Sequence, residues 1–519
     1  MLWLRIFGLL TILSSLLYWE WLFTHVDSHY LAWAWSFTIC TILGSIPTVV
    51  FILNNLSRKP VKTPLISDMN WPKVAVIIPV WNEPIDIVER TIRSVVSQDY
   101  PQEQITVIVT DDGRSPVLKQ LVSQLAKTHR KTGFIYTVPP MKGTLLRDRL
   151  GEGKAGNLNS ALHFIADSPS YSYVETRDCD DIVPNRHFLK YCITYLVRHR
   201  NAGFVQTIKD VAADKYDTFD NRTQHFYRHE MRSKYAANAI FPCGSGVVYR
   251  KAAVASIGGF ASWNLVEDFQ TGMEILKKGW DCGYLPIVGA YGQIAPQDMP
   301  NFYKQRGTWT LDAVRLLLFR TKKGLTARQR LHFMESALHY SLAWTLFPIA
   351  LTPSIALILN QYPFRFNWAT YASVFLSQFF FSQLFVYIAH GRPSIRQFIR
   401  TYQVFTFAMA FVYLTMSLKA LIYGPNRKPR YVNTRKVHQF GLYWKEVLPQ
   451  LVMLIILLSA AVYHFIESKS FNTYMLASLL WSCFFIYMFG YSVRLAVYGY
   501  SFSSNISRHT PLQHIESQS

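Results

Sequence analysis

Long apolar stretches lie near both ends of the chain, and the region between them alternates short apolar and polar segments. Each stretch can cross about 30 Å of hydrocarbon as a helix. They predict six membrane spans, over residues 2–25, 30–54, 334–358, 368–390, 446–466 and 473–498. The first is too long for the apolar region of a signal peptide and is followed at once by a second, so we favour a span over a cleaved leader.

The region from 71 to 320 alternates short apolar runs with polar helical stretches, which is typical of an α/β domain. The runs "VAVIIPV" (74–80), "ITVIVT" (105–110) and "GFVQT" (203–207) predict strands. Because the first two are apolar on both faces, they fit a buried parallel sheet. The expected fold class is therefore membrane α-helical plus α/β.

Basic residues set the expected orientation. Arg58, Lys59 and Lys62 follow the second span, so the positive-inside rule places this flank and the N-terminus in the cytoplasm. A further apolar segment, 398–422, has basic clusters on both sides, and crossing would leave one cluster outside. A helix lying in the membrane plane keeps both inside. The basic, aromatic and aliphatic residues of 301–320 predict another interfacial helix.

Composition narrows the choice of partners. The chain of 519 residues has a formal net charge of +21, and half of its residues are hydrophobic. This balance fits contact with membrane lipid or an anionic substrate, whereas no recognised nucleic-acid-reading motif is present. The six cysteines form no CxxC pair. Reduced thiols are therefore expected, rather than a zinc site or a disulfide framework.

Acidic residues follow two of the expected strands and a third run, "YSYVET" (171–176), that ends in the same way. Glu83 ends "VAVIIPVWNE", Asp111 stands in "ITVIVTDDG", and Asp178 and Asp180 stand in "YSYVETRDCDD". In an open parallel sheet, ligands bind beyond the carboxyl ends of the strands. Each cluster alone could be a solvated loop, but the three together predict one acidic pocket.

An acidic pocket in a basic protein suggests a divalent metal that bridges to an anion. Oxygen ligands favour Mg²⁺ or Mn²⁺, which commonly keep waters and substrate phosphates as further ligands. Asp178 and Asp180 are the expected metal-binding pair, and Lys154 in "EGKAGNLNSAL" supplies a positive charge for phosphate. The chain has no GxxxxGK[ST] loop, so an ATPase of that kind is not supported.

Seven motifs, taken together and in order, resemble those of the membrane-integrated processive glycosyltransferases of family 2, most closely the bacterial cellulose synthases. They are "PVWNE", "TDDG", "KAGNLN", "DCD", "FPCGSG", "VED" and "QRGTW", within a resemblance that spans about residues 71–440. The resemblance implies a cytoplasmic GT-A domain inserted between membrane helices. It also implies inverting transfer of glucose from UDP-glucose into a β-glucan that crosses the membrane.

The resemblance also implies a role for each matching residue. Asp268 is the implied general base, with Glu267 beside it, because a sugar hydroxyl needs a carboxylate to remove its proton. The nucleotide-sugar contacts are Trp81, Glu83, Asp111, Lys154, Asp178, Gln305 and Arg306, and the acceptor contacts are Cys243, Gly244, Ser245 and Trp309. The structural alternatives are a helix N-terminal acid for Asp268, a turn for "FPCGSG" and core packing for Trp309.

Two motifs depart from the family pattern. "QRGTW" resembles QxxRW, but Thr308 stands where the family has arginine, so either Arg306 supplies the charge or the diphosphate contact is weaker. "RYVNTRK" resembles the gating loop FxVTxK through Tyr431, Thr434 and Lys436, and Asn433 replaces the valine. A basic solvated loop is the alternative for this segment.

The implied organisation has eight parts. They are two transmembrane helices (1–56), the GT-A domain (70–300), interfacial helices (301–330), two transmembrane helices (331–392), an interfacial helix (393–424), the gating-like loop (425–445), two transmembrane helices (446–500) and a short cytoplasmic tail (501–519). The tail leaves no room for the cyclic-di-GMP-binding PilZ domain of many bacterial cellulose synthases. The bacterial inner membrane is the expected location.

Several functions stay open on sequence alone. Cellulose, a β-1,3-glucan and a mixed-linkage glucan all fit a β-glucan synthase. The alternatives are a chitin- or hyaluronan-type synthase using another UDP-sugar, a non-processive transferase to a lipid carrier, and a transporter or non-catalytic scaffold. Expected partners are a UDP-sugar donor, the nascent polysaccharide and membrane lipid. Accessory subunits or a homo-oligomer are compatible with the sequence, and nucleic acid is not expected.

Overall fold

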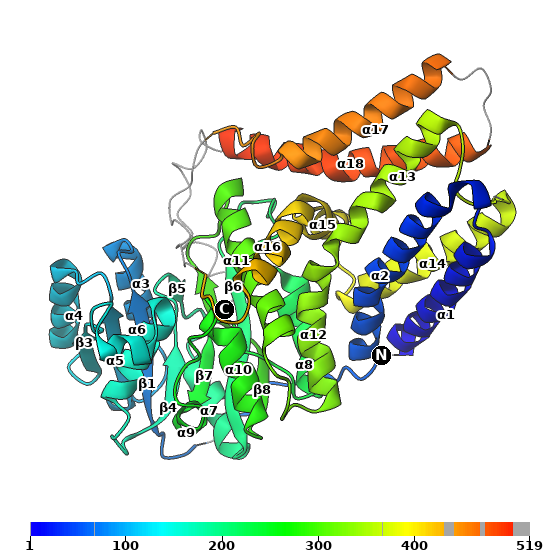
Figure 1. Cartoon of the computed structure of the whole chain (residues 1–519). Coiled ribbons are helices and arrows are strands. Elements are labelled where there is room, and N and C mark those ends of the chain that lie inside the picture. The colour runs from blue at the N-terminus through cyan, green and yellow to red at the C-terminus, as the bar shows by residue number, and fades with distance from the viewer. Residues whose placement is uncertain (1, 67, 366, 430–440, 468–472, 502–519) are drawn as a thin grey trace.

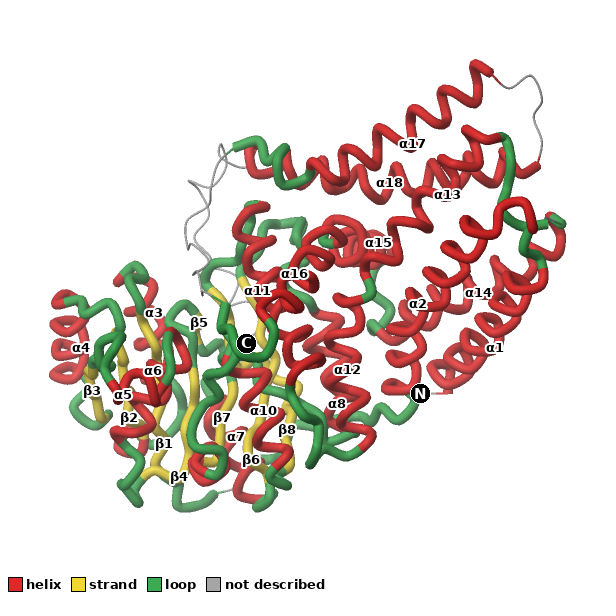
Figure 2. Tube along the Cα trace, viewed as in Figure 1, coloured by secondary structure: helices red, strands yellow, loops and turns green. Residues whose placement is uncertain are grey.

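The computed structural model describes residues 2–66, 68–365, 367–429, 441–467 and 473–501, and the chain has two parts (Figure 1). One part is a sheet with helices on both faces, as Figure 2 shows. The other is a group of long helices contributed by both ends of the chain. The α/β domain is thus inserted between helical segments, as the hydrophobic pattern predicts.

Eight strands form one sheet in the order β3-β2-β1-β4-β7-β6-β8-β5. Their bounds are β1 Lys73–Val80, β2 Ile105–Asp111, β3 Gly133–Thr137, β4 Tyr171–Thr176, β5 Asp181–Ile182, β6 Ala202–Val211, β7 Val247–Arg250 and β8 Asp281–Gly292. β1 to β4 run parallel, and β7 lies antiparallel between β4 and β6. The three strands predicted from the apolar runs are confirmed, and the carboxyl ends of β1, β2 and β4 meet at one edge.

Helices cover both faces of the sheet, which is why the strands read as continuous apolar runs. On β1, Val74, Val76 and Ile78 pack against α3, α4 and α7, whereas Ala75 and Ile77 pack toward α6, α9 and α10. The helices and helical turns of this part are α3 Ile85–Val96, α4 Pro116–Thr128, α5 Leu145–Leu150, α6 Gly153–Phe164, α7 Phe188–Arg198, η3 His225–Glu230, α8 Met231–Ala236, α9 Lys251–Ala255 and α10 Glu267–Lys277. The core of the domain therefore lies in two layers, one on each side of the sheet.

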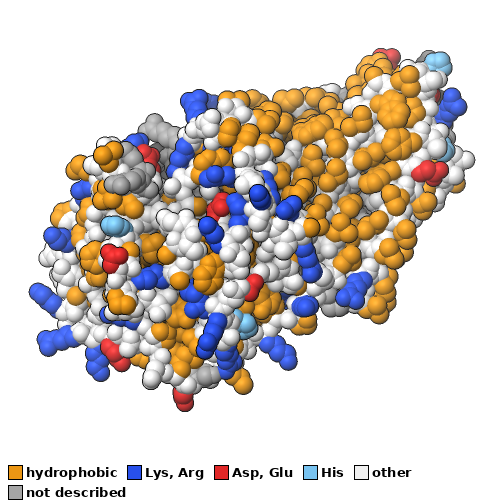
Figure 3. Space-filling view, turned by 60° about the horizontal axis from the view of Figure 1, so that its bottom comes forward, with side chains coloured by type: hydrophobic (Ala, Val, Ile, Leu, Met, Phe, Trp, Pro, Cys, Tyr) orange, Lys and Arg blue, Asp and Glu red, His pale blue; other side chains and the backbone are white. Residues whose placement is uncertain are grey.

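Five described helices are long and apolar enough to cross a membrane. They are α1 Leu2–Thr24, α2 Leu31–Asn55, α14 Trp368–Ala389, α17 Leu448–Glu467 and α18 Thr473–Ser501. Figure 3 shows hydrophobic side chains crowded over this helical part, whereas Lys and Arg gather over the α/β domain and along the boundary between the two. The helical part thus has the surface expected of a segment that sits in lipid.

Two further helix pairs are long and apolar enough to cross a membrane only if each pair is counted as one bent span. The first pair is α12 Ala327–Ser341 with α13 Leu346–Leu359, bent by 40°, and the second is α15 Ile395–Tyr402 and its continuation to Ala408 with α16 Ala410–Tyr423, bent by 45°. The described residues therefore offer five to seven spans. The predicted number of six corresponds to counting the first pair as a span and the second as interfacial.

Helix α11 (Met299–Phe319) joins the two parts of the molecule. A Cβ at Gly307 would lie 3.3 Å from Met416, so α11 and α16 are in close contact. The Tyr303 hydroxyl donates to the Ala408 carbonyl at 2.9 Å, and Leu316, further along α11, is buried in the core of the α/β domain. The segment predicted from 301–320 is therefore a helix that fixes the sheet relative to the membrane-side helices.

A buried ion pair stands at the end of β4. The side chains of Arg177 and Glu175 have no exposed surface, and Arg177 Nε donates to Glu175 Oε1 at 2.6 Å. The guanidinium also donates to the Gly289 carbonyl at 3.0 Å, which ties β4 to β8. Because an unpartnered buried charge is costly, this corner of the sheet depends on both partners.

We expect Glu175→Ala to lower the free energy of unfolding by about 3–5 kcal/mol, because Arg177 would stay buried without its partner. The partly exposed pair of Glu89 and Arg93 on α3 provides a matched control, and Glu89→Ala should cost about 0.5 kcal/mol or less. Heating the detergent-solubilised variants and measuring the folded fraction by size-exclusion chromatography compares them. Equal thermal stability of the two variants would contradict this prediction.

Candidate functional site

Lys154 stands at the centre of the edge where the strands end. It is the second residue of α6, and its Nζ donates to Asp178 Oδ1 at 2.5 Å and to the Gly244 carbonyl at 3.1 Å. The same Nζ lies 3.1 Å from Glu267 Oε1. These partners come from the loop after β4, the turn before β7 and the first turn of α10. One ammonium group therefore joins four segments that are far apart in the sequence.

Lys209 holds the other side of Asp178. It lies on β6, and its Nζ is 2.8 Å from Asp178 Oδ2 and 2.8 Å from Asp181 Oδ2. Sequence reasoning missed this residue, although a signal was present, because Lys209 stands near the carboxyl end of the predicted strand in "GFVQTIKDV". Two lysines on opposite sides thus fix the orientation of one aspartate.

The charges of this network shift one another's pKa. Desolvation favours the neutral form of Asp178, but Lys154 and Lys209 outweigh it and hold the pKa of Asp178 well below its ordinary value. Desolvation also disfavours the Lys154 ammonium, yet Asp178 and Glu267 raise the pKa of Lys154 well above its ordinary value. Both groups are therefore charged at neutral pH.

Asp268, the second residue of α10, shows the opposite behaviour. Desolvation and the neighbouring Glu267 raise the pKa of Asp268 to about 8, although Lys154 opposes this shift. Its Oδ1 accepts the Phe269 amide at 2.6 Å. A carboxylate whose pKa lies near neutrality is suited to take a proton from a substrate hydroxyl. Within one network, Asp178 is thus held as an anion, whereas Asp268 is poised to titrate.

Gly244 lets the turn before β7 approach these charges. Its φ of +80° is left-handed, and a Cβ there would lie 2.9 Å from Lys154 Nζ and 3.2 Å from Asp268 Oδ2. The next residue, Ser245, accepts the Asp178 amide on its hydroxyl at 3.2 Å. The motif "FPCGSG" therefore borders both Asp178 and Asp268, and only glycine fits at its centre.

Helix α11 holds the turn that precedes Asp268. Asp312 Oδ2 accepts the Val266 amide at 2.6 Å, and Asn264 Nδ2 donates to the Asp312 carbonyl at 3.0 Å. Burial raises the pKa of Asp312 to about 7. Sequence reasoning did not identify Asp312, because its side chain binds a backbone amide 46 positions away in the chain. It is a positioning residue that fixes where α10 begins.

Trp81 and Glu83 lie on the loop after β1, and Asp111 is the last residue of the adjoining strand β2. Asp111 is fully buried and accepts the Tyr136 hydroxyl at 2.8 Å. Glu83 accepts the Trp81 amide at 2.5 Å, and Trp81 itself is half exposed. The two loops touch, since a Cβ on Gly113 would clash with the loop after β1. The structure thus places these three residues beside one another, at the same edge as Asp178.

Arg306 and Trp309 pack together on α11. The Arg306 guanidinium lies 4.6 Å from the ring centroid of Trp309 and 5.0 Å from that of Phe405. Thr308, at the position of the family arginine, donates its hydroxyl to a backbone carbonyl one turn earlier in the same helix. Gln305 is a partly buried neighbour on this helix. Arg306 is therefore a cation among aromatic rings, whereas Thr308 contributes no charge.

The predicted acceptor residues are among the described residues, whereas the predicted gating residues are not. Cys243 is partly buried, its amide donates to Gln206 Oε1 at 2.8 Å, and burial and the nearby Asp268 raise the pKa of its thiol. The gating-loop positions lie outside the described residues; they are Tyr431, Thr434 and Lys436. The acceptor motif therefore borders the charged network, and the gating loop stays a prediction.

The predicted metal pair differs in the surroundings of its two carboxylates. Both oxygens of Asp178 are bound by lysines, whereas Asp180 is 7% exposed and its backbone carbonyl accepts the Gln293 amide at 2.8 Å. The described residues contain no group of three His, Cys, Asp or Glu side chains arranged to hold an ion. A bound Mg²⁺ or Mn²⁺ would therefore take most of its ligands from water and a substrate diphosphate, and Asp178 would exchange a lysine contact for the ion.

The chain is similar to known glycosyltransferases in sequence and in fold. Residues 72–311 match the family described as glycosyltransferase like family 2. The cellulose synthase catalytic subunits of Xanthomonas axonopodis pv. citri and Pseudomonas fluorescens are 28% and 31% identical over 56% and 52% of this chain. These matches cover 38% and 35% of the two relatives, so the chain corresponds to only part of their length.

A solved structure supports the same conclusion about the fold. It is a mannosyltransferase of Pyrobaculum calidifontis in complex with GDP-Man and Mn²⁺, 18% identical, with a TM-score of 0.54 over 74% of this chain and 99% of that protein. The predicted GT-A fold of the α/β domain is thereby confirmed. Residues 72–311 of the chain are therefore similar to glycosyltransferase family 2, and in sequence they resemble the catalytic subunits of bacterial cellulose synthases.

Proposed function

We propose that this protein is a processive, inverting glycosyltransferase that polymerises glucose from UDP-glucose into a β-glucan and moves the polymer across the membrane. The observation that carries the proposal is the position of Asp268. It shares one charged network with Lys154 and Asp178, and its pKa is raised to about 8. A base therefore stands next to groups suited to bind a nucleotide diphosphate.

The donor would lie along the edge formed by β1, β2 and β4. Trp81, Glu83 and Asp111 would contact the uridine, since an exposed indole can stack on a base and carboxylates accept hydrogen bonds. Lys154 would contact the diphosphate as a point charge. Asp180, with Asp178, would hold the divalent ion, which when bound stabilises negative charge on the leaving group.

The transfer itself needs one proton acceptor. The acceptor hydroxyl oxygen forms a bond to the anomeric carbon, and its proton passes to the Asp268 carboxylate. The bond between that carbon and the diphosphate oxygen breaks, and UDP leaves with the electron pair. Attack from the face opposite the leaving group turns an α-linked donor into a β-linked product. Gly244 lets the turn before β7 approach Asp268, and the end of the growing chain would bind beside this turn.

A cavity among the membrane-side helices supports the translocation step. Its volume is about 370 Å³, and its lining includes aromatic side chains such as Tyr371, Phe379 and Trp481. Phe405 also lines it, and Phe405 shares the Arg306 guanidinium with Trp309. Aromatic faces suit the apolar faces of sugar rings. A polymer end stacked on Trp309 would thus meet this cavity, with the catalytic domain in the cytoplasm and the helices in the inner membrane.

Asp268→Asn should reduce sugar transfer by about 10²–10⁴-fold while leaving UDP binding intact, because only the proton acceptor is removed. UDP release by purified protein with Mn²⁺ and a panel of UDP-sugars measures transfer, and a linkage-specific glucanase identifies the polymer. Asp86→Asn, on the exposed face of α3, is the matched control and should keep wild-type activity. Wild-type rates in Asp268→Asn would remove this residue from the mechanism. If the wild-type protein released UDP only from a UDP-sugar other than UDP-glucose, the proposed donor would be wrong.

The rate of transfer should rise with pH and level off above about pH 8. Asp268 acts as a carboxylate, and its pKa is raised to about 8, so protonation at lower pH removes the base. Glu267→Gln should move the midpoint to lower pH, because Glu267 is one cause of the raised pKa. Initial rates between pH 6 and 9 test this, and a flat profile would contradict it.

Asp180→Ala should abolish the effect of Mn²⁺ on UDP binding, since Asp180 would be the main protein ligand of the ion. Titration calorimetry with UDP, with and without Mn²⁺, measures the difference directly. Asp167→Ala, an exposed acid beyond the end of α6, serves as the control and should bind like wild type. Undiminished metal-dependent binding in Asp180→Ala would refute the assignment.

A further inference from the structure

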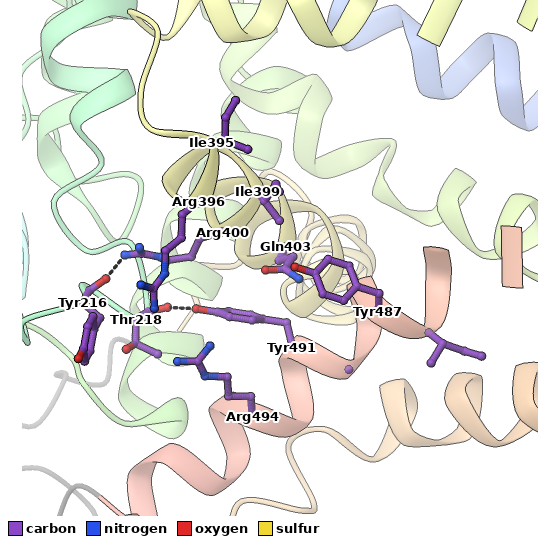
Figure 4. A pocket seen from close by; sticks show the side chains of 12 residues that line it. Tyr216, Thr218, Ile395, Arg396, Ile399, Arg400, Gln403, Tyr487, Tyr491 and Arg494 are labelled. Carbon is purple, nitrogen blue, oxygen red and sulfur yellow. Dashed lines mark hydrogen bonds between the residues drawn. The ribbon is translucent and has the colours of Figure 1, made fainter. Parts of the chain in front are cut away.

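A second cavity, separate from the charged network, opens between the α/β domain and the membrane-side helices. Its volume is about 650 Å³, and it lies between the loop after β6 and helices α15 and α18. Figure 4 shows Arg396 and Arg400 reaching into it from α15 and Arg494 from α18. We name it the arginine pocket and define it by these three residues with Ile399 and Ile486.

The lining of the arginine pocket is basic, and the acids of the adjoining loop bind groups of their own surroundings. Among the described residues, its lining contains no Asp or Glu. In the adjoining loop, Asp214 accepts the amides of Tyr216 and Thr218, and Asp217 accepts amides further along its own loop. Asp220 accepts the Thr401 hydroxyl at 2.7 Å. The lining of the pocket therefore carries three arginines and no acid, and the nearby Asp220 offsets part of the charge of Arg400.

The three arginines differ in how firmly they are held. Arg400 Nη1 donates to the carbonyls of Tyr216 and Asp217, the latter at 2.9 Å, so it is fixed in the wall. Arg396 lies 5.3 Å from the ring of Tyr216, and Arg494 lies 5.7 Å from that of Tyr491. Both of these side chains are exposed. Their guanidinium groups are thus available to a ligand and are arranged on two facing elements.

The pocket changes from apolar to basic along α18. Ile486, Gly490 and Arg494 line it at four-residue spacing, so they lie on one face of the helix. Ile486 belongs to the part of α18 that is apolar enough to span a membrane, and Arg494 lies close to the end of that part. Ile395 and Ile399 supply further apolar surface from α15. A ligand that fits this gradient has an anionic head and a hydrocarbon tail.

We propose that the arginine pocket binds the phosphate head of an anionic phospholipid, whose acyl chains lie along Ile399 and Ile486. Guanidinium groups bind phosphate through two parallel hydrogen bonds, and basic pockets at the membrane surface favour anionic headgroups. Tyr491, which donates to the Thr218 carbonyl at 2.6 Å, fixes α18 against the domain at the floor of the pocket. A bound lipid would therefore connect α15, α18 and the loop after β6.

Native mass spectrometry of the full chain, released from nanodiscs of phosphatidylcholine with phosphatidylglycerol, tests the proposal. Wild type should retain phosphatidylglycerol in preference to phosphatidylcholine. The double variant Arg396→Gln, Arg494→Gln should bind it roughly thirtyfold more weakly, the factor expected when two cations near an anionic headgroup are lost. Lys59→Gln, Lys62→Gln removes the same charge after α2 and should retain the lipid like wild type.

A variant that fills the pocket tests whether lipid binding needs the space of the pocket or only its positive charge. Nothing lies within 4 Å of a Cβ built at Gly490, so Gly490→Leu fills the pocket without a clash at Cβ and leaves every arginine in place. Gly490→Leu should lose phosphatidylglycerol, and Gly490→Ala should bind it more strongly than Gly490→Leu does. Equal retention by wild type, the double variant and Gly490→Leu would overturn the proposal. So would displacement of the lipid by millimolar inorganic phosphate, which would assign the pocket to a free phosphate.

Discussion

The edge of the sheet that carries the candidate site depends on two ion pairs, which Asp178 forms with Lys154 and Lys209. Lys154 comes from α6 and Lys209 from β6, and each lies within 2.8 Å of a different oxygen of Asp178. Like any buried or half-buried charge, this carboxylate is tolerated only because opposite charges satisfy it. These contacts, with that of Lys154 to Glu267, also bring α6, β6, α10 and the end of β4 together. The ion pairs that neutralise Asp178 are therefore the same contacts that assemble the site.

The network also explains how neighbouring carboxylates acquire different properties. Asp178 lies between two ammonium groups and stays ionised, whereas Asp268 shares Lys154 with Glu267 and has a raised pKa. Two acids placed in environments that separate their pKa values are typical of sites that divide binding from proton transfer. This division is the physical basis of the roles that we propose for Asp178 and Asp268.

Helix α11 couples this chemistry to the membrane side of the molecule. Two residues of this helix make the connection: Asp312 binds the turn before Asp268, and Gly307 packs against α16. Arg306, on the same helix, lies between Trp309 and Phe405, and Phe405 lines the cavity among the membrane-side helices. One helix, α11, therefore contacts both α16 and the turn before Asp268.

The sequence by itself determined the long apolar helices, the strands β1, β2 and β6, and the acids that follow the strands, because these depend on local periodicity and on the rule that parallel strands end at one edge. The ordered motifs also indicated Lys154, Asp178 and Asp268. Only the tertiary structure revealed Lys209 and Asp312, whose partners are distant in the chain. It also decided that Arg306 faces aromatic rings and that Arg396 and Arg494 share a pocket, because such contacts depend on how separate helices pack, which no local pattern encodes.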